Sequence, residues 1–172
     1  MTGENKQDYR ENIILIGMPG AGKSTVGPLL ASELGFAFVD TDEIVRDADG
    51  RDLKDIVNED GLEKFLEIQK KAIMSVEFRR SVVATGGGVV KSGELMRHFK
   101  DIGKVIFLKQ DLEILEQRLM PGRRLARETG QDFSSLYKER EPLYTGYADY
   151  TVYCGAKTAQ EIVREILDKC RI

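Results

Sequence analysis

A glycine-rich segment near the N-terminus has the residue types and the spacing needed to hold a chain of phosphates. Residues 17–24 read Gly-Met-Pro-Gly-Ala-Gly-Lys-Ser, which matches the pattern Gly-x-x-x-x-Gly-Lys-Ser/Thr without a mismatch. Glycines let backbone N–H groups turn toward one anion, Lys23 reaches the β- and γ-phosphates, and the Ser24 hydroxyl is placed for Mg²⁺. A chance match in a glycine-containing turn is disfavoured, because an apolar run precedes the segment and a helical pattern follows it. The segment therefore predicts binding of a nucleoside triphosphate.

Two acidic residues, Asp40 and Asp42, follow the next apolar run along the chain. Because they are two positions apart, their side chains leave the strand on the same side. Ligands of open α/β sheets bind at the carboxyl edge of the strands. One carboxylate can therefore hold Mg²⁺ through water, while the other orients an attacking hydroxyl or accepts its proton. The alternative is that Asp42 or Thr41 only caps the next helix.

Three consecutive glycines, Gly86, Gly87 and Gly88, follow a third apolar run. They offer backbone N–H groups with no side chain in the way, so a ligand can approach the main chain closely. The alternative is an ordinary turn between a strand and a helix.

A basic stretch, at about residues 120–135, combines proline, glycine and arginines, a composition that suits a mobile flap. Arg123, Arg124 and Arg127 lie within it and Arg118 just before it. Once such a lid closes, an arginine can neutralise charge on a transferring phosphoryl group. A solvated basic loop is the alternative for any single arginine here.

The elements that must position these motifs alternate along the chain. Short apolar or β-branched runs predict strands, and longer amphipathic stretches between them predict helices. This alternation indicates an α/β fold, with five mostly parallel strands and helices on both faces of the sheet, in a single domain over residues 1–172. The strands are expected at 12–18, 36–40, 81–85, 104–109 and 150–154, and the helices at about 23–34, 59–79, 92–100, 111–119, 133–146 and 158–169.

Composition excludes several classes of function. With 26 Lys+Arg against 29 Asp+Glu, the net charge is −3, so no uniformly basic surface is available for nucleic acid. The two cysteines, Cys154 and Cys170, belong to no Cys-x-x-Cys pair or Cys/His cluster, which favours reduced thiols over a disulfide framework or a zinc site. No signal peptide and no membrane-spanning run is seen. We expect a cytoplasmic protein, a monomer, that binds a small-molecule substrate and neither nucleic acid nor membrane.

The motifs together resemble those of the shikimate kinase family. The phosphate loop, Asp40-Thr41-Asp42, Gly86-Gly87-Gly88 and Arg140-Glu-Pro-Leu-Tyr144 occur in the family's order, and the resemblance covers nearly the whole chain. It implies a P-loop kinase fold of the nucleoside-monophosphate-kinase type, with a lid at about 120–135 and a substrate-binding helical region at about 41–79. The implied reaction is transfer of the γ-phosphate of ATP to a ring hydroxyl of shikimate, with Mg²⁺, in aromatic amino-acid biosynthesis.

The resemblance also implies a role for individual residues. Lys23, Asp42 and Arg123 would be catalytic, and Ser24 and Asp40 would serve Mg²⁺. The other assignments follow by position: Gly20, Ala21, Gly22, Lys23, Ser24, Thr25, Arg118 and Arg123 for ATP, with Arg118 stacking on adenine, and Asp42, Gly86, Gly87, Gly88 and Arg140 for shikimate, with Arg140 gripping its carboxylate. In the lid, Arg123-Arg124-Leu125 stands where the family has Arg-Pro-Leu.

One departure from the family concerns the acceptor. Residues 65–69 read Phe-Leu-Glu-Ile-Gln, where the family carries Phe-Arg-x-x-Glu, so Leu66 replaces a substrate-clamping arginine and Gln69 a glutamate. The two positions are neighbours on one helix face, so both charges are lost together. Leu66 also belongs to an apolar stripe, which predicts equally that it packs in the core.

Three hypotheses for function remain open from the sequence. The first is an ATP:shikimate 3-phosphotransferase. The second is a kinase of the same fold that acts on another small hydroxylated metabolite, which the residues at positions 66 and 69 motivate. The third is a nucleotide-binding module without phosphotransfer.

Overall fold

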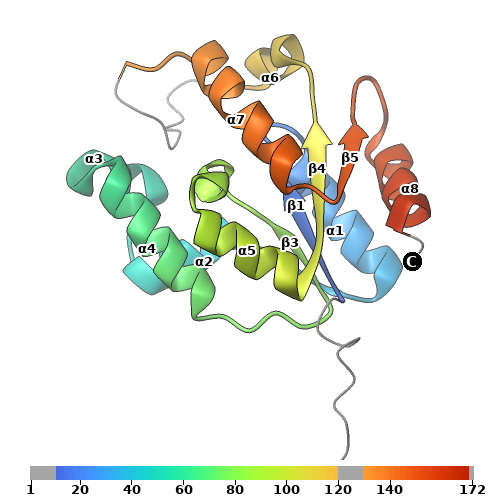
Figure 1. The fold of residues 1–172 in the computed structure, drawn as a ribbon, viewed down its shortest axis with the longest axis horizontal. Coiled ribbons are helices and arrows are strands. Elements are labelled where there is room, and N and C mark those ends of the chain that lie inside the picture. Colours follow the sequence, from blue (N-terminus) through green and yellow to red (C-terminus); the bar gives the residue numbers. More distant parts are fainter. Residues whose placement is uncertain (1–10, 120–129, 171–172) are drawn as a thin grey trace, which may run out of the picture.

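One parallel sheet of five strands forms the centre of the molecule, in the order β2-β3-β1-β4-β5 (Figure 1). The computed structural model describes residues 11–119 and 130–170. Strands β1 and β3 are buried along their whole length, which explains why their sequences read as continuous apolar runs. The bounds are β1 (Asn12–Ile16), β2 (Ala37–Asp40), β3 (Ser81–Ala84), β4 (Gly103–Lys109) and β5 (Tyr150–Tyr153). All five expected strands are confirmed, with ends that differ by at most two residues.

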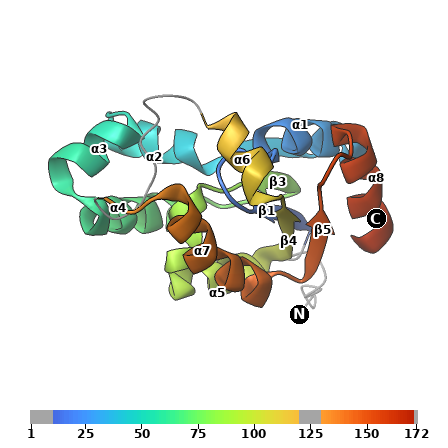
Figure 2. The same cartoon turned by 90° about the horizontal axis from the view of Figure 1, so that it is seen from above.

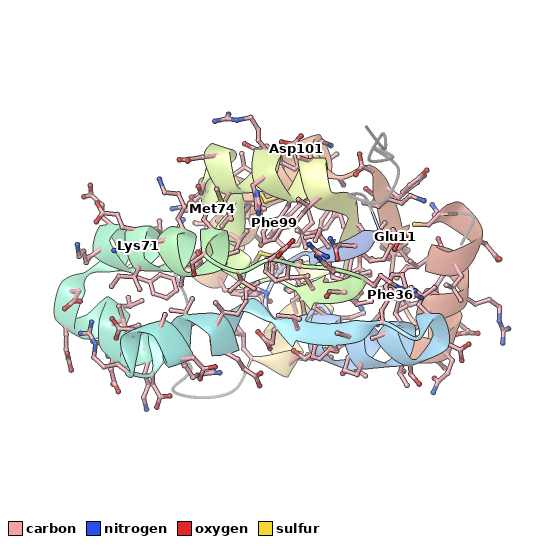
Figure 3. The ribbon with its side chains drawn as sticks, turned by 90° about the horizontal axis from the view of Figure 1, so that it is seen from below. Glu11, Phe36, Lys71, Met74, Phe99 and Asp101 are labelled. Carbon is pink, nitrogen blue, oxygen red and sulfur yellow. The ribbon has the colours of Figure 1, made fainter. Side chains whose placement is uncertain are left out.

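Helices cover both faces of this sheet, as expected (Figure 2). One face carries α1 (Lys23–Leu34) and α8 (Ala159–Cys170), and the other carries α5 (Gly93–Ile102) and α7 (Phe133–Tyr147). The short helix α6 (Leu112–Arg118) follows β4 and packs beside α7. Phe99 of α5 is completely buried in the main core, which fills the space between these helices and the sheet (Figure 3).

A second group of helices lies to one side of the sheet (Figure 1). It consists of α2 (Thr41–Asp49), α3 (Leu53–Asp60) and α4 (Leu62–Met74). These helices enclose their own small apolar cluster, formed by Val45, Ile56, Val57, Phe65 and Ala72. Lys71 lies on the outer, solvent-facing side of α4 (Figure 3). The group branches off directly after Asp40, so it is attached to the carboxyl edge of the sheet.

The expected single helix over 59–79 is wrong at both ends. Residues 59 and 60 belong to α3, because Gly61, with φ of +86°, ends that helix before α4 begins. Helix α4 ends at Met74, capped by Ser75. Helix α2 was not among the helices expected from the apolar pattern, although it lies in the helical region at about 41–79 that the resemblance implies. It ends at Gly50 in the left-handed conformation, with φ of +88°.

Arg51 ties the ends of α2 and α3 together. Its guanidinium contacts Asp49 at 2.6 Å, Asp60 at 2.8 Å and Glu59 at 3.0 Å. Hydrogen bonds from Arg51 hold the pKa of the Asp49 and Asp60 carboxyl groups below the ordinary value. Because these pKa values are lowered on folding, the contribution to stability is present above the unfolded pKa and is lost as the pH falls through the folded pKa.

We therefore expect acid to destabilise the wild-type protein more than an Arg51→Gln variant. Thermal unfolding at pH 7 and at about pH 3, below the ordinary pKa of aspartate, measures this directly. The melting temperature of the wild type should fall further between the two conditions, because only the wild type has the ion pairs of Arg51 to lose. Equal pH dependence in the two proteins would contradict this role of Arg51.

No helix in residues 11–119 or 130–170 has both the length and the apolar character that crossing a membrane requires. The expected lid arginines Arg123, Arg124 and Arg127, like residues 120–129 as a whole, lie outside the described residues.

Candidate active site

The phosphate loop connects the end of β1 to the start of α1. Gly20 and Gly22 adopt φ values of +84° and +106°, which side chains other than glycine rarely accept, so the loop curls above the first turn of the helix. Lys23 is only 8% exposed, and its Nζ donates hydrogen bonds to the carbonyl oxygens of Gly17 and Met18, the latter at 2.9 Å. The buried ammonium thus stays over the loop, while the Ser24 and Thr25 side chains are exposed.

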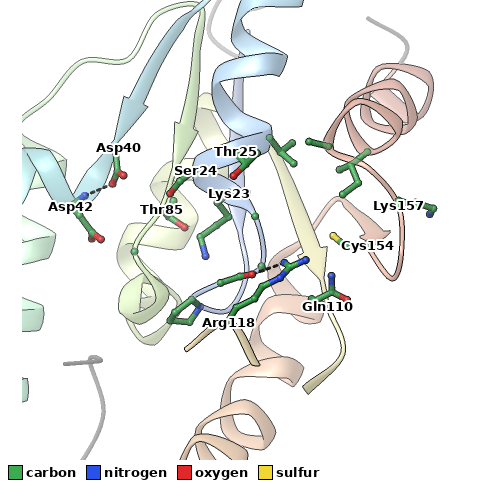
Figure 4. A pocket seen from close by; sticks show the side chains of 18 residues that line it. Lys23, Ser24, Thr25, Asp40, Asp42, Thr85, Gln110, Arg118, Cys154 and Lys157 are labelled. Atoms are coloured by element: carbon green, nitrogen blue, oxygen red, sulfur yellow. Dashed lines mark hydrogen bonds between the residues drawn. The ribbon is translucent and has the colours of Figure 1, made fainter. Parts of the chain in front are cut away.

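An open cavity of about 450 Å³ surrounds this loop (Figure 4). It brings together groups from five separate parts of the chain: the loop, the end of β2, the turn after β3, the segment after β4 and the segment after β5. Among the predicted site residues, the cavity is lined by Gly20, Ala21, Gly22, Lys23, Ser24, Thr25, Asp40, Asp42, Gly86 and Arg118. Gly88 and Arg140 are not among the described residues of its lining.

Asp40 caps a helix in addition to its expected role toward a metal. Its Oδ1 accepts a hydrogen bond from the backbone N–H of Asp42 at 2.9 Å, so Asp40 caps α2. The alternative in which Asp42 or Thr41 caps this helix is therefore wrong. Since an ionised carboxylate has about four lone-pair positions, the cap leaves capacity for a water-bound cation. Ser24 and Asp40 supply the oxygen donors that Mg²⁺ prefers, and both line the cavity, so these residues fit that ion.

Gly86 lets Asp42 and Gln69 approach the turn after β3. A Cβ atom at Gly86 would lie 2.6 Å from Oδ1 of Asp42, which is too close, and 3.0 Å from Nε2 of Gln69, which is a tight contact. Gln69, on α4, is 2% exposed. The three residues come from three elements and meet at one edge of the cavity, beside the phosphate loop. This convergence would suit a ligand that offers hydroxyl groups.

The backbone N–H of Gly86 does not face a ligand, contrary to the expectation for the glycine triplet. It donates a hydrogen bond to the Thr41 hydroxyl at 2.9 Å, and Thr41 is completely buried. The chain then enters a short 3₁₀ helix, η2 (Gly87–Lys91). At this position, the glycine provides space for Asp42 and Gln69 rather than a hydrogen-bond donor.

Arg140 lies on α7, a helix that packs against η2 and β4. Its side chain is completely buried. Tyr144 is one turn further along the helix and 1% exposed, and burial raises the pKa of its hydroxyl to about 12. A buried guanidinium is favoured when it meets an anion, so this position suits an acidic ligand group.

Arg118 lies across the phosphate loop from the other side. Its Nη1 donates a hydrogen bond to the carbonyl oxygen of Gly20 at 2.8 Å (Figure 4). The cavity around it has lining residues that the sequence analysis did not assign to the site, among them Thr85, Gln110, Cys154 and Lys157. All of them follow the carboxyl ends of strands, where ligands of open α/β sheets bind. This position is the feature of the sequence that could have predicted them. Burial raises the pKa of the Cys154 thiol to about 11, so this cysteine stays protonated at neutral pH.

Comparison with known proteins decides the family. A family model described as shikimate kinase matches residues 19–171. The chain belongs to the shikimate kinase family. A shikimate kinase of Persephonella marina is 37% identical over 163 residues, which cover 93% of this chain and 99% of that protein. Another, of Moorella thermoacetica, is 37% identical over 164 residues, or 90% of this chain and 91% of the relative.

Solved structures of the family agree with the fold. The structure of shikimate kinase from Acinetobacter baumannii in complex with shikimate superposes with a TM-score of 0.82 at 28% identity, and the match covers 97% of each chain. The expected P-loop kinase fold of the nucleoside-monophosphate-kinase type is therefore confirmed.

Leu66 stands where the resemblance implies an arginine. Leu66 is half-buried and packs against the apolar cluster of α2, α3 and α4. It is not among the described residues that line the cavity. The contact of Leu66 with the apolar cluster agrees with the packing alternative. Gln69, one turn along the same helix and likewise absent from that lining, lies beside Gly86.

Proposed function

We propose that the chain transfers the γ-phosphoryl group of ATP to a hydroxyl of shikimate, giving shikimate 3-phosphate. The observation that carries this proposal is the shared cavity: the phosphate loop, Asp40, Asp42 and Gly86 line one space in a chain that belongs to the shikimate kinase family. A donor phosphate and an acceptor hydroxyl can meet there without water between them, which is the arrangement that phosphoryl transfer needs.

The residues of the loop act on the donor. Gly20 to Thr25 hold the phosphates of ATP, and Lys23 stabilises negative charge on the transferring group. Ser24 and Asp40 would hold Mg²⁺, which, when bound, neutralises charge on the β- and γ-phosphates. Arg118 lies at the adenine. Arg123, outside the described residues, is proposed to contact the γ-phosphate from the lid at about 120–135.

Another group of residues acts on the acceptor. Asp42 orients the attacking hydroxyl and accepts its proton, and its place beside Gly86 and Gln69 supports this role. Gly86, Gly87 and Gly88 line the acceptor site, and the buried Arg140 binds the carboxylate. In this account, the helices within about 41–79 form the acceptor-binding region of a single domain. We further propose that the enzyme works as a monomer in the cytoplasm, with small molecules as its only partners.

A coupled assay of ADP release tests the proposal. Mg-ATP is supplied with shikimate at millimolar concentration, and with a panel of other small polyols and hydroxy acids in parallel. Shikimate-dependent ADP release well above that of the other acceptors is expected. No shikimate-dependent turnover would overturn the proposal, and ATP binding without turnover on any acceptor would indicate a nucleotide-binding module.

A kinase for another hydroxylated metabolite is the second candidate, because Leu66 and Gln69 stand where the family has arginine and glutamate. A Leu66→Arg variant separates the two. Since Leu66 packs against an apolar cluster, we expect this variant to lose about 1–2 kcal/mol of stability and to keep kcat/KM for shikimate within about threefold. A rise of kcat/KM by more than about tenfold would instead mean that the wild-type site is built for a different acceptor.

A further inference from the structure

The cavity extends beyond the groups that handle phosphate and acceptor. On the side of the phosphate loop away from Asp40 and Asp42, it is lined by Gln110, Arg118, Cys154 and Lys157 (Figure 4). The loop itself takes the phosphates and the acceptor lies on the Asp42 side. The nucleoside of ATP must therefore occupy this third part of the cavity.

Gln110, the residue directly after β4, connects three segments at this end. Its side chain is almost fully buried, with 3% of the residue exposed. Oε1 accepts a hydrogen bond from the backbone N–H of Asp111 at 2.9 Å, and Nε2 donates one to the carbonyl oxygen of Gly155 at 3.3 Å. Its own carbonyl oxygen accepts a hydrogen bond from the Tyr137 hydroxyl at 3.3 Å. Gln110 thus joins the start of α6, the turn after β5, and α7.

The turn after β5 supplies much of the wall on this side. Cys154 and Lys157, which flank Gly155, both line the cavity, as does Ala159 at the start of α8. The turn is tight: Gly155 has φ of +49°, and a Cβ atom there would lie 3.0 Å from the Tyr153 ring. The backbone N–H of Cys154 donates to the carbonyl oxygen of Lys109 at 2.8 Å, and the backbone N–H of Lys157 donates to the carbonyl oxygen of Cys154 at 2.9 Å. The first bond holds the start of the turn to β4, and the second closes the turn on itself.

We infer that Gln110 is a positioning residue for the nucleoside. It acts by fixing the turn 154–157 against the end of β4, so that the wall around the base and ribose is formed before ATP arrives. Such preorganisation lowers the ordering cost of binding. The inference rests on the nucleotide-binding part of the proposed function and is independent of which acceptor is used.

Only an amide of this length serves both contacts. Glutamate would turn an oxygen toward the carbonyl oxygen of Gly155, so the hydrogen bond would be replaced by repulsion. Methionine has a similar size but would leave the Gly155 carbonyl and the Asp111 N–H without their partner. Both substitutions should therefore weaken the attachment of the turn to the end of β4 without touching the phosphate loop.

The test compares a ligand that has a nucleoside with one that lacks it. Dissociation constants of Mg-ATP and of Mg-tripolyphosphate are measured by calorimetry for the wild type, Gln110→Glu and Gln110→Met, with Gln117→Glu on the exposed side of α6 as the control of equal charge. We expect the Gln110 variants to bind ATP about 5- to 30-fold more weakly and to bind tripolyphosphate within about twofold of wild type. In turnover, KM for ATP should rise while kcat at saturating ATP stays within about twofold.

Two results would overturn the inference: equal weakening of both ligands, which would indicate general damage to the fold, or unchanged ATP affinity in both Gln110 variants. If the glutamate variant does not fold, the methionine variant gives the same comparison. Because the binding measurement needs no acceptor, absence of shikimate turnover would overturn the proposed function while leaving this inference intact.

Discussion

Replacing Lys23 by methionine should lower kcat for phosphoryl transfer by about 10²- to 10³-fold, the effect of removing one preorganised charge donor from a transition state. The ammonium is buried, and hydrogen bonds to Gly17 and Met18 hold it over the loop. It is therefore in place before the substrate arrives. Among the described residues of the phosphate loop that line the cavity, Lys23 alone carries a positive charge. Methionine has a similar length and keeps the packing. Steady-state ADP release at saturating ATP and acceptor measures the loss.

The exposed Lys71→Met on α4 is the matched control, since it removes the same charge far from the loop. Its kcat should stay within about twofold of wild type, as is usual for exposed sites. Circular dichroism verifies that both variants are folded. A folded Lys23→Met protein that keeps more than a tenth of the wild-type kcat would contradict the assignment of Lys23.

Asp42→Asn should lower kcat by about 10²- to 10⁴-fold, the usual range for loss of a general base, and should leave the affinity for Mg-ATP nearly unchanged. Asparagine has the same shape, so it retains the close fit with Gly86 and Gln69 but cannot accept a proton from the attacking hydroxyl. The hydrogen bond from the N–H of residue 42 to Asp40 is a backbone contact and is also retained. Comparing kcat with the dissociation constant of Mg-ATP separates chemistry from nucleotide binding.

Asp47→Asn, on the exposed side of the same helix α2, makes the same change of charge away from the cavity. It should leave kcat within about twofold of wild type. If Asp42→Asn weakens ATP binding as strongly as it lowers kcat, Asp42 acts on the donor rather than on the acceptor, and its proposed role is wrong.

The sequence predicts the sheet well because buried parallel strands are continuous apolar runs, as in β1 and β3. The helices beside it are harder to predict. Helices α2 and α3, with 9 and 8 residues, were not separated from the polar stretch around them by the apolar pattern. The expected helix over 59–79 was too long for a different reason: Val76 and Phe78 continue the apolar pattern beyond Met74 and pack against the main core without being helical.

The motif residues of the site are predictable because the phosphate loop and the Asp40–Asp42 pair depend on local spacing. The partners that shape the site are not, since their contacts join distant parts of the chain. Thr41 meets Gly86 across 45 residues, and Gln110 meets Gly155 across another 45. Local spacing also predicted, wrongly, that the backbone N–H of Gly86 is free to bind a ligand. This N–H donates a hydrogen bond to a hydroxyl that comes from another element.

Phosphorus NMR of a reaction with Mg-ATP and saturating shikimate tests the central claim most directly. The account predicts that ADP and a shikimate phosphate monoester appear in equal amounts, that the phosphorylated position is the 3-hydroxyl, and that both signals are nearly lost with Lys23→Met. ATP that stays intact in the presence of shikimate, or that is hydrolysed to inorganic phosphate without a phosphorylated acceptor, would contradict it.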